Sequence, residues 1–150
     1  MRLQPLIPLD CPVPEPPDHP RFGFAVLGPE HNAADLEAWS SSIAHIRATP
    51  GFGGDGWPQR AYSLEENLAD LQEHRDHHQR HLDFAWTVLD RERPGTVLGC
   101  VYLYPDPSGA ADAKARSWVR VDRADMDRVL RAHLRPWFAT AWPLRARYDT

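Results

Sequence analysis

The apolar and polar positions of the chain follow two alternating periods. Four segments, 21–28, 84–89, 96–104 and 115–121, contain β-branched and aromatic residues and are bounded by glycine, proline or charged residues, which is typical of β-strands. Charged residues, a proline and a glycine fill the interval 90–95. The pattern therefore predicts a hairpin with a long loop at this point.

Three other segments carry apolar residues at every third or fourth position, which is the helical period. The first, 33–47, follows Asn32, a residue type that commonly caps helices. The second opens with Ser63 and Glu66, which form a capping-box sequence at the start of a leucine-rich stripe. The third covers 126–138 and has charged residues on its other faces. We expect one helix in each segment.

A last strand is predicted over 144–148, where apolar and basic residues alternate. The helix before it is long enough for a crossover, so this strand can return parallel to the strand that precedes the helix. The order of elements is then β-α-α-β-β-β-α-β, an α+β fold with an antiparallel meander and one parallel crossover strand. Seven prolines between residues 5 and 20 exclude a helix or a central strand there. We therefore divide the chain into a proline-rich arm, 1–21, and a domain, 22–150.

Composition places the chain among globular proteins of one domain. It has 150 residues, of which 42% are hydrophobic and 25% are charged. The net charge of -4 argues against a nucleic-acid partner, which requires clustered positive charge. No apolar run approaches the roughly 20 residues of a membrane span. Cys11 and Cys100 do not resemble a disulfide framework, so we expect reduced thiols and a cytoplasmic protein.

Three of the predicted strands carry sequences that resemble a known family. The segments 84–90 (FAWTVLD), 97–105 (VLGCVYLYP) and 117–120 (SWVR) look like the central strands of actinobacterial proteins of the GNAT (GCN5-related N-acetyltransferase) superfamily. The resemblance covers about 22–150 and implies a GNAT-like mixed sheet. It also implies acetyl-CoA as co-substrate and transfer of the acetyl group to a small-molecule amine, by direct attack of the amine on the thioester.

The resemblance assigns cofactor-binding residues around the start of the third helix. In the family, the backbone of the strand before this helix pairs with the pantetheine of acetyl-CoA. That role falls here on Val119, Arg120 and Val121. A glycine-containing loop then wraps the pyrophosphate, because backbone amides can approach phosphate closely at glycine. The matching segment, 121–127, contains no glycine.

Arginine side chains are candidates to replace the missing glycine loop, because a guanidinium binds phosphate oxygens in a bidentate manner. The candidate residues are Arg120, Arg123 and Arg128. In the alternative interpretation, these arginines form ion pairs with carboxylates of the same segment, Asp122, Asp125 and Asp127.

The resemblance also places the acceptor side of the site. His74, on the second predicted helix, borders the acceptor pocket and is a candidate base or substrate contact. Tyr148 lies near the position of a tyrosine that protonates the leaving thiolate in some GNAT enzymes. In the glycine-rich loop 49–58, Phe52 and Trp57 are candidate substrate contacts of a mobile lid. The alternative for each aromatic residue is packing in the core.

Four histidines fall within the second predicted helix and its end: His74, His77, His78 and His81. Their spacings, with Asp70 nearby, are also those of metal ligands on a helix. However, these side chains lie on or beside the leucine stripe, where histidines more often take structural or solvated positions. We therefore expect no metal site.

Two functional hypotheses follow. The first is N-acetyl transfer from acetyl-CoA to a small amine, with Tyr148 and His74 as catalytic residues. The second is a non-catalytic GNAT-like binding or dimerisation module that has lost acetyl-CoA binding, favoured by the glycine-free segment and by a chain that stops after the last predicted strand. The aromatic residues Trp137, Phe138 and Trp142 lead us to expect a homodimer through the C-terminal strand.

Overall fold

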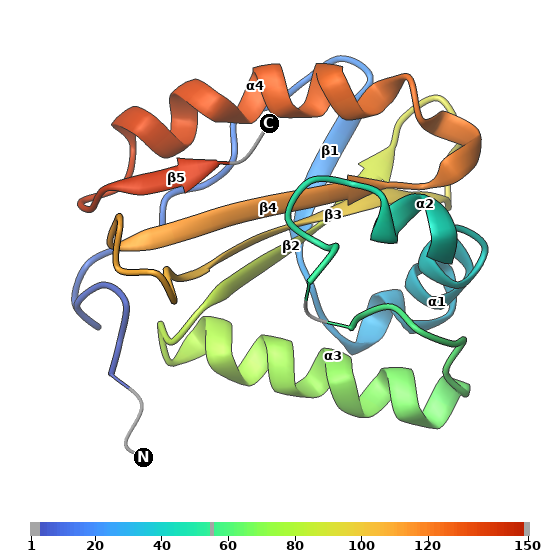
Figure 1. Ribbon diagram of the computed structural model, residues 1–150, viewed down its shortest axis with the longest axis horizontal. Helices are drawn as coiled ribbons and strands as arrows, with labels where there is room; N and C mark the ends of the chain where they lie inside the picture. The colour runs from blue at the N-terminus through green and yellow to red at the C-terminus, as the bar shows by residue number, and fades with distance from the viewer. Residues whose placement is uncertain (1–3, 55, 149–150) are drawn as a thin grey trace.

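The computed structural model describes residues 4–54 and 56–148, which form a five-stranded sheet with helices on both faces (Figure 1). The strands lie in chain order in the sheet. They are β1 (Phe22–Val26), β2 (Phe84–Asp90), β3 (Val97–Pro105), β4 (Ala113–Val119) and β5 (Ala146–Tyr148). Neighbours are antiparallel except β4 and β5, which are parallel. The predicted α+β fold, its meander and its parallel return are confirmed.

The described part of β5 pairs with the first three residues of β4. Residues 113–115 of β4 run parallel to residues 146–148 of β5. Further along β4, the Ser117 carbonyl accepts a hydrogen bond from Arg131 Nη2 of α4 at 3.5 Å. The C-terminal part of β4 is therefore in contact with α4.

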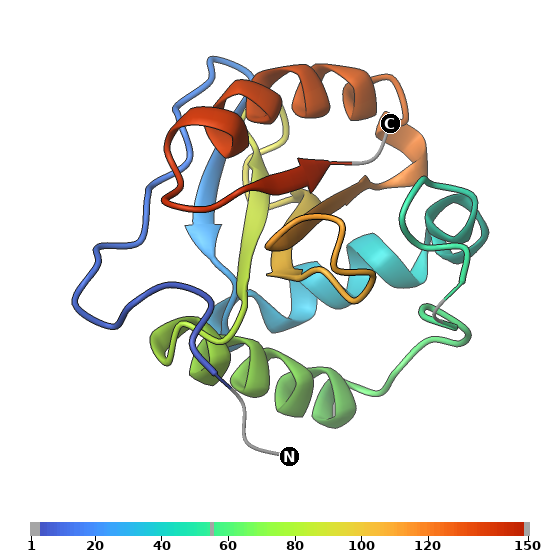
Figure 2. The same cartoon turned by 60° about the vertical axis from the view of Figure 1, so that its left-hand side comes forward.

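Helix α4 covers one face of the sheet, and α1, α2 and α3 lie on the other (Figure 1); Figure 2 shows the same layers from a second side. The helical segments are η1 (Pro29–His31), α1 (Asn32–Ser40), α2 (Ile43–Arg47), α3 (Leu64–Gln79), η2 (Val121–Arg123) and α4 (Met126–Thr140). The single helix predicted over 33–47 is thus two helices, α1 and α2.

Helix starts agree with the sequence in one case and differ in another. The capping box of α3 is confirmed, since Ser63 Oγ accepts from the Glu66 amide at 3.1 Å and Glu66 Oε1 accepts from the Ser63 amide at 2.9 Å. Asn32 does not cap α1, because it is the first residue of the helix and its side chain bonds to Asn67 of α3 instead. Contact between the two helices takes precedence over local capping here.

The main apolar cluster lies between the sheet and α4. Alternate residues of β2, among them Phe84, Trp86 and Val88, point into this cluster. The ring of Trp86 lies 5.3 Å from that of Trp137 and 5.9 Å from that of Trp142. The aromatic residues at the end of α4 are therefore buried in this chain's own core.

The proline-rich arm packs against the domain. Ile7 is buried in the main cluster, and the Leu6 amide donates to the His81 carbonyl at 2.6 Å. Further along the arm, the Pro17 carbonyl accepts a hydrogen bond from the ring of His133 on α4 at 2.7 Å. Both cysteines are unpaired. None of the helices in the described part of the chain combines the length and the apolar character of a membrane span.

Candidate active site

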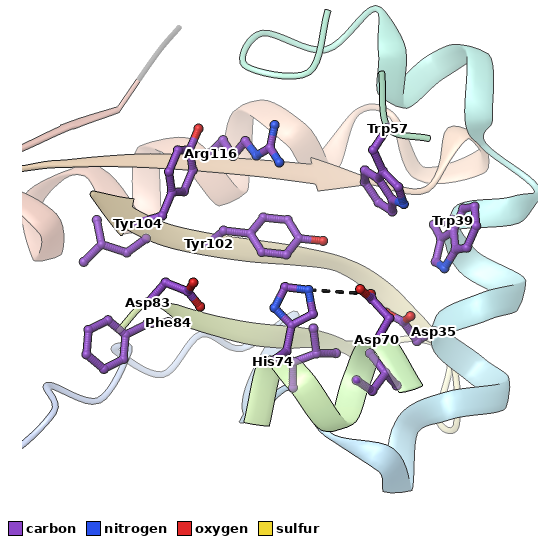
Figure 3. A pocket seen from close by; sticks show the side chains of 13 residues that line it. Asp35, Trp39, Trp57, Asp70, His74, Asp83, Phe84, Tyr102, Tyr104 and Arg116 are labelled. Carbon is purple, nitrogen blue, oxygen red and sulfur yellow. Dashed lines mark ion pairs between the residues drawn. The ribbon is translucent and has the colours of Figure 1, made fainter. Parts of the chain in front are cut away.

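A cavity of about 350 Å³ lies on the face of the sheet opposite α4, between the sheet, α1 and α3 (Figure 3). Its acidic side chains are Asp35, Asp70 and Asp83. Its aromatic side chains are Trp39, Trp57, Tyr102 and Tyr104, while Phe84 borders the cavity and packs its ring under α4. Carboxylates enclosed by aromatic rings attract cations both by direct charge and through the ring faces.

A buried asparagine organises the acidic end of the cavity. Asn67 of α3 is 1% exposed, and its Oδ1 accepts a hydrogen bond from Trp39 Nε1 at 3.0 Å. Its Nδ2 donates to Asp35 Oδ2 at 3.1 Å and to Asn32 Oδ1 at 2.8 Å. Asn32, Asp35 and Trp39 are three and four residues apart, so they lie on one face of α1. One amide therefore fixes both side chains that α1 directs to the cavity.

Burial sets the protonation of the two carboxylates. Burial raises the pKa of Asp35 to about 7; the hydrogen bond from Asn67 opposes this rise and the charge of Asp70 adds to it. Burial also raises the pKa of Asp70, while the opposite charge of His74 lowers it. The His74 Nε2 lies 3.6 Å from Asp70 Oδ2. Asp35 can therefore exchange a proton near neutral pH, which an exposed aspartate does not.

Tyr102 forms the floor of the cavity on β3. Its hydroxyl oxygen accepts a hydrogen bond from Trp118 Nε1 at 2.9 Å, and its ring lies 5.8 Å from that of His74. Burial raises the pKa of Tyr102 well above its usual value, so the phenol stays neutral. The floor is thus rigid and uncharged.

The glycine-rich loop contributes Trp57 to the cavity wall, with the Trp57 ring 5.3 Å from that of Trp39. Phe52 is only 1% exposed and packs in the core, where the Arg116 guanidinium lies 4.2 Å from its ring centroid. Arg116 Nη1 also donates to the Gly51 carbonyl at 2.9 Å. Of the two aromatic residues that we predicted as substrate contacts, Trp57 lines the cavity and Phe52 instead anchors the loop.

No family model matches the chain, and no curated protein sequence matches it. Solved structures do match. RimL, a ribosomal L7/L12 alpha-N-protein acetyltransferase in complex with coenzyme A, gives a TM-score of 0.62 at 16% identity, over 81% of this chain and 64% of that chain. The chain has the GNAT fold.

Two further GNAT-fold structures match over a similar extent. The microcin C7 self immunity acetyltransferase MccE, in complex with acetyl-CoA and AMP, gives a TM-score of 0.60 at 8% identity, over 82% of this chain and 65% of that chain. The ribosomal-protein-S5-alanine acetyltransferase from Vibrio fischeri gives a TM-score of 0.59 at 12% identity, over 83% of this chain and 67% of that chain. The chain therefore spans about two thirds of the length of each of these proteins.

Within the GNAT fold, Tyr148 and His74 lie on opposite faces of the sheet. Successive side chains of a strand alternate between faces, so Arg116 of β4 faces the cavity while Ser117 faces α4. The Tyr148 hydroxyl hydrogen-bonds Ser117, and its ring stacks edge-on against Phe138 at 5.5 Å. Burial raises the pKa of Tyr148 to about 12. The structure therefore does not bring the two predicted catalytic residues together, and Tyr148 lies instead on the α4 side of the sheet, beside Ser117 and Phe138.

Two of the three arginines that we predicted to bind phosphate are held in ion pairs. Arg120 donates to both carboxylate oxygens of Glu37, each at 2.8 Å, and to Asp122 at 2.6 Å. Arg123 donates to the buried Asp90 at 2.6 Å. Both guanidinium groups thus have short contacts with carboxylates, as the alternative interpretation of these arginines expects. Only Asp122 was among the partners expected from the sequence, since Glu37 and Asp90 come from distant segments.

The third arginine, Arg128, is exposed on α4. It lines another cavity, of about 360 Å³, together with Pro50, Asp127, Arg131 and Arg135. Arg131 Nε donates to Asp127 Oδ2 at 3.0 Å, and Arg135 Nη1 donates to the Tyr148 carbonyl at 3.2 Å. Arg128 therefore differs from its two neighbours in being exposed.

The backbone predicted to pair with pantetheine is partly occupied. The Arg120 amide donates to a β3 carbonyl at 2.8 Å, and the Val121 amide donates to Ser42 Oγ at 2.9 Å. Val119 is the last residue of β4. Of the three residues predicted to pair with pantetheine, two therefore have amides that are already bonded within the chain.

The histidines of α3 and its end have separate surroundings. His77 Nδ1 bonds Asp83 Oδ2 at 2.9 Å, His81 bonds the Pro8 carbonyl at 3.1 Å, and burial lowers the pKa of His78 to about 4. In the part of the chain that the structure describes, no three His, Cys, Asp or Glu side chains are arranged to hold a metal ion.

Sequence reasoning missed Asp35 and Asn67 as site residues. Asp35 falls in the first turn of a predicted helix, where acidic residues are common, and a lone asparagine such as Asn67 does not indicate a site. A signal was present, because residues that can hydrogen-bond recur every three or four positions on both helices: Asn32, Asp35 and Trp39 on one, and Asn67, Asp70 and His74 on the other. Only the packing of α1 against α3 shows that these two faces meet.

Proposed function

We propose that the protein transfers an acetyl group from acetyl-CoA to a small primary amine bound in the cavity of Figure 3. The observation that carries this proposal is the pair of carboxylates, Asp35 and Asp70, at the end of an aromatic cavity. A primary amine is an ammonium ion near neutral pH, so charge and ring faces both favour it there. The cavity volume suits a small molecule.

In this proposal the cofactor lies along the C-terminal part of β4. Pantetheine is an extended chain with two amides, and such chains join strands by backbone hydrogen bonds. Helix α4 contacts β4 and offers the exposed Arg128 for phosphate groups. RimL and MccE were solved with coenzyme A and acetyl-CoA respectively, and they share this fold.

Direct transfer needs no covalent intermediate on the protein. The amine nitrogen attacks the thioester carbon, the C–N bond forms, the C–S bond breaks, and the thiolate takes up a proton. Tyr148 is a neutral phenol on β5, beside Ser117 of β4, so it is our candidate donor of that proton. His74 contacts Asp70 at the cavity wall and takes the role of a substrate contact.

The test mixes the protein with acetyl-CoA and a panel of small primary amines, and measures thiol release together with the acetylated product by mass spectrometry. We expect one amide formed for each thiol released. Arg128→Ala should weaken acetyl-CoA binding about 10- to 150-fold, because a charge-assisted hydrogen bond is worth roughly 1.5–3 kcal/mol. The matched control is Arg80→Ala, which removes an exposed arginine of the α3 end and should not change binding.

The ion pairs of the η2 segment favour one alternative, a GNAT-fold binding module without catalysis. That alternative requires no thermal shift and no heat of binding with millimolar acetyl-CoA. The homodimer through the C-terminal strand stays a prediction, and sedimentation at high micromolar concentration tests it.

A further inference from the structure

We propose that Asp35 is the proton acceptor for the ammonium group of the substrate, and that Asn67 is the residue that positions it; this inference rests on the proposed acetyl transfer. The argument begins with location. Asp35 lines the cavity but is 5% exposed, and it is held from its buried side by the Asn67 amide. A group in this position can meet a bound ligand while bulk water is largely excluded.

Asn67 uses both hydrogens of its side-chain amide. Its oxygen accepts from Trp39, and its nitrogen donates to Asp35, to Asn32 Oδ1 and, at 3.3 Å, to the Asn32 carbonyl. Among the described residues, Asn67 is the only side chain that donates a hydrogen bond to Asp35. Both orientation of the carboxylate and part of its acidity therefore depend on this one amide.

Asp35 is better suited than its neighbours to accept the proton. Asp70 is more exposed, and its Oδ2 lies 3.6 Å from His74 Nε2. Tyr102 is a neutral phenol. The charged and titratable groups that line the cavity with Asp35 are Asp70 and His74 on α3, Tyr102 and Tyr104 on β3, Asp83 before β2 and Arg116 on β4. The buried thiol of Cys100 on β3 lies behind this lining.

The proton balance is complete without another reagent. An N–H bond of the ammonium breaks and an O–H bond forms on Asp35, which frees the nitrogen lone pair. The lone pair attacks the thioester carbon, and the C–S bond electrons leave on the thiolate. Tyr148 gives its phenol proton to the thiolate and takes up the second amine proton, and Asp35 returns its proton to water after the products leave. A base whose pKa lies near the working pH performs this exchange best.

The experiment uses the full chain, acetyl-CoA and 2-phenylethylamine, a primary amine with an aromatic body. It measures kcat/KM from pH 5 to 9 for the wild type, Asp35→Asn, Asn67→Leu and the control Gln72→Leu, which changes an exposed residue of α3. The Asp35 carboxyl is titrated in parallel by carbon-13 NMR without substrate. Circular dichroism checks the fold, and Asp35→Asn keeps the shape of the side chain.

We expect an acid limb near pH 7 in the wild type that matches the NMR titration of Asp35. Asp35→Asn should abolish this limb and lower kcat/KM by about 10²–10⁴-fold. Asn67→Leu should move both the limb and the NMR titration to higher pH, whereas Gln72→Leu should move neither.

Two results overturn the inference. If Asp35→Asn keeps wild-type kcat/KM and its acid limb, another group accepts the proton, although acetyl transfer itself stands. If Asn67→Leu folds and leaves the Asp35 titration in place, the positioning role is wrong. Absence of transfer by the wild type with every amine of the panel instead contradicts the proposed function, and this inference with it.

Discussion

The face of the sheet under α4 and the face under α1 and α3 are filled in different ways. Under α4, apolar side chains form one continuous cluster that includes three tryptophans. Under α1 and α3, a smaller apolar cluster surrounds a cavity of about 350 Å³ with buried carboxylates and an amide network. Burial of apolar surface stabilises a fold, whereas burial of a charge costs free energy. The comparison indicates that one face supplies stability and the other holds the chemistry.

The largest expected effect comes from truncating the core under α4. Trp86→Ala removes a buried side chain that contacts Trp137 and Trp142, and it should lower the free energy of unfolding by about 3–5 kcal/mol. The control is Leu64→Ala, at a residue that is 55% exposed, which should change it by less than about 0.5 kcal/mol. Urea denaturation measures both. A loss below about 1 kcal/mol for Trp86→Ala would show that this face is not the main source of stability.

On the cavity face, replacing the buried carboxylate Asp35 is expected to increase the free energy of unfolding. Because burial raises the pKa of Asp35 to about 7, the folded protein favours the protonated carboxyl. The stability from this group is complete below about pH 4, the unfolded pKa, and is lost as the pH rises to about 7. Asp35→Asn avoids that loss.

Asp35→Asn should therefore be about as stable as the wild type at pH 4 and more stable at pH 8, by at most about 4 kcal/mol at 1.36 kcal/mol per pKa unit. Thermal unfolding at both pH values measures the difference. Asp76→Asn, at an exposed site of α3, should show no such dependence on pH. Equal stability of Asp35→Asn and the wild type at pH 8 would mean that this face carries no destabilising charge.

The sequence contained most of the fold and little of the site. The strands and the α3 capping box follow from local patterns, and those patterns agree with the packing. Asp35 and Asn67 become site residues only because α1 lies against α3, and Arg120 and Arg123 are held by Glu37 and Asp90 from distant parts of the chain. Such contacts depend on tertiary packing, which single-sequence patterns do not encode.

The ion pair between Arg123 and Asp90 joins η2 to the end of β2, and its contribution to stability can be measured. Arg123→Met leaves Asp90, 3% exposed, without its cation, and should cost about 3 kcal/mol. The double variant Arg123→Met/Asp90→Asn should recover much of this loss, since the uncompensated charge is then gone. No recovery in the double variant would mean that the arginine acts through packing rather than charge.

The smallest expected effect is local to β5. Arg147 binds both carboxylate oxygens of Asp106, at 2.7 and 3.0 Å, and this pair fastens β5 to the β3–β4 hairpin. Asp106→Asn should speed hydrogen exchange of the β5 amides without changing exchange in β2. Asp10→Asn, at an exposed site in the arm, is the control. Unchanged exchange in β5 would show that backbone pairing alone holds the strand beside β4.

The central claim is that the acidic, aromatic cavity holds the amine that receives the acetyl group. Its most direct test is acetyl transfer from acetyl-CoA to 2-phenylethylamine at pH 8, with the amide quantified by mass spectrometry for the wild type and for Asp35→Asn/Asp70→Asn. The account predicts amide formation by the wild type and a loss of about 10²-fold or more in kcat/KM in the double variant. A folded double variant that forms the amide at the wild-type rate would contradict it.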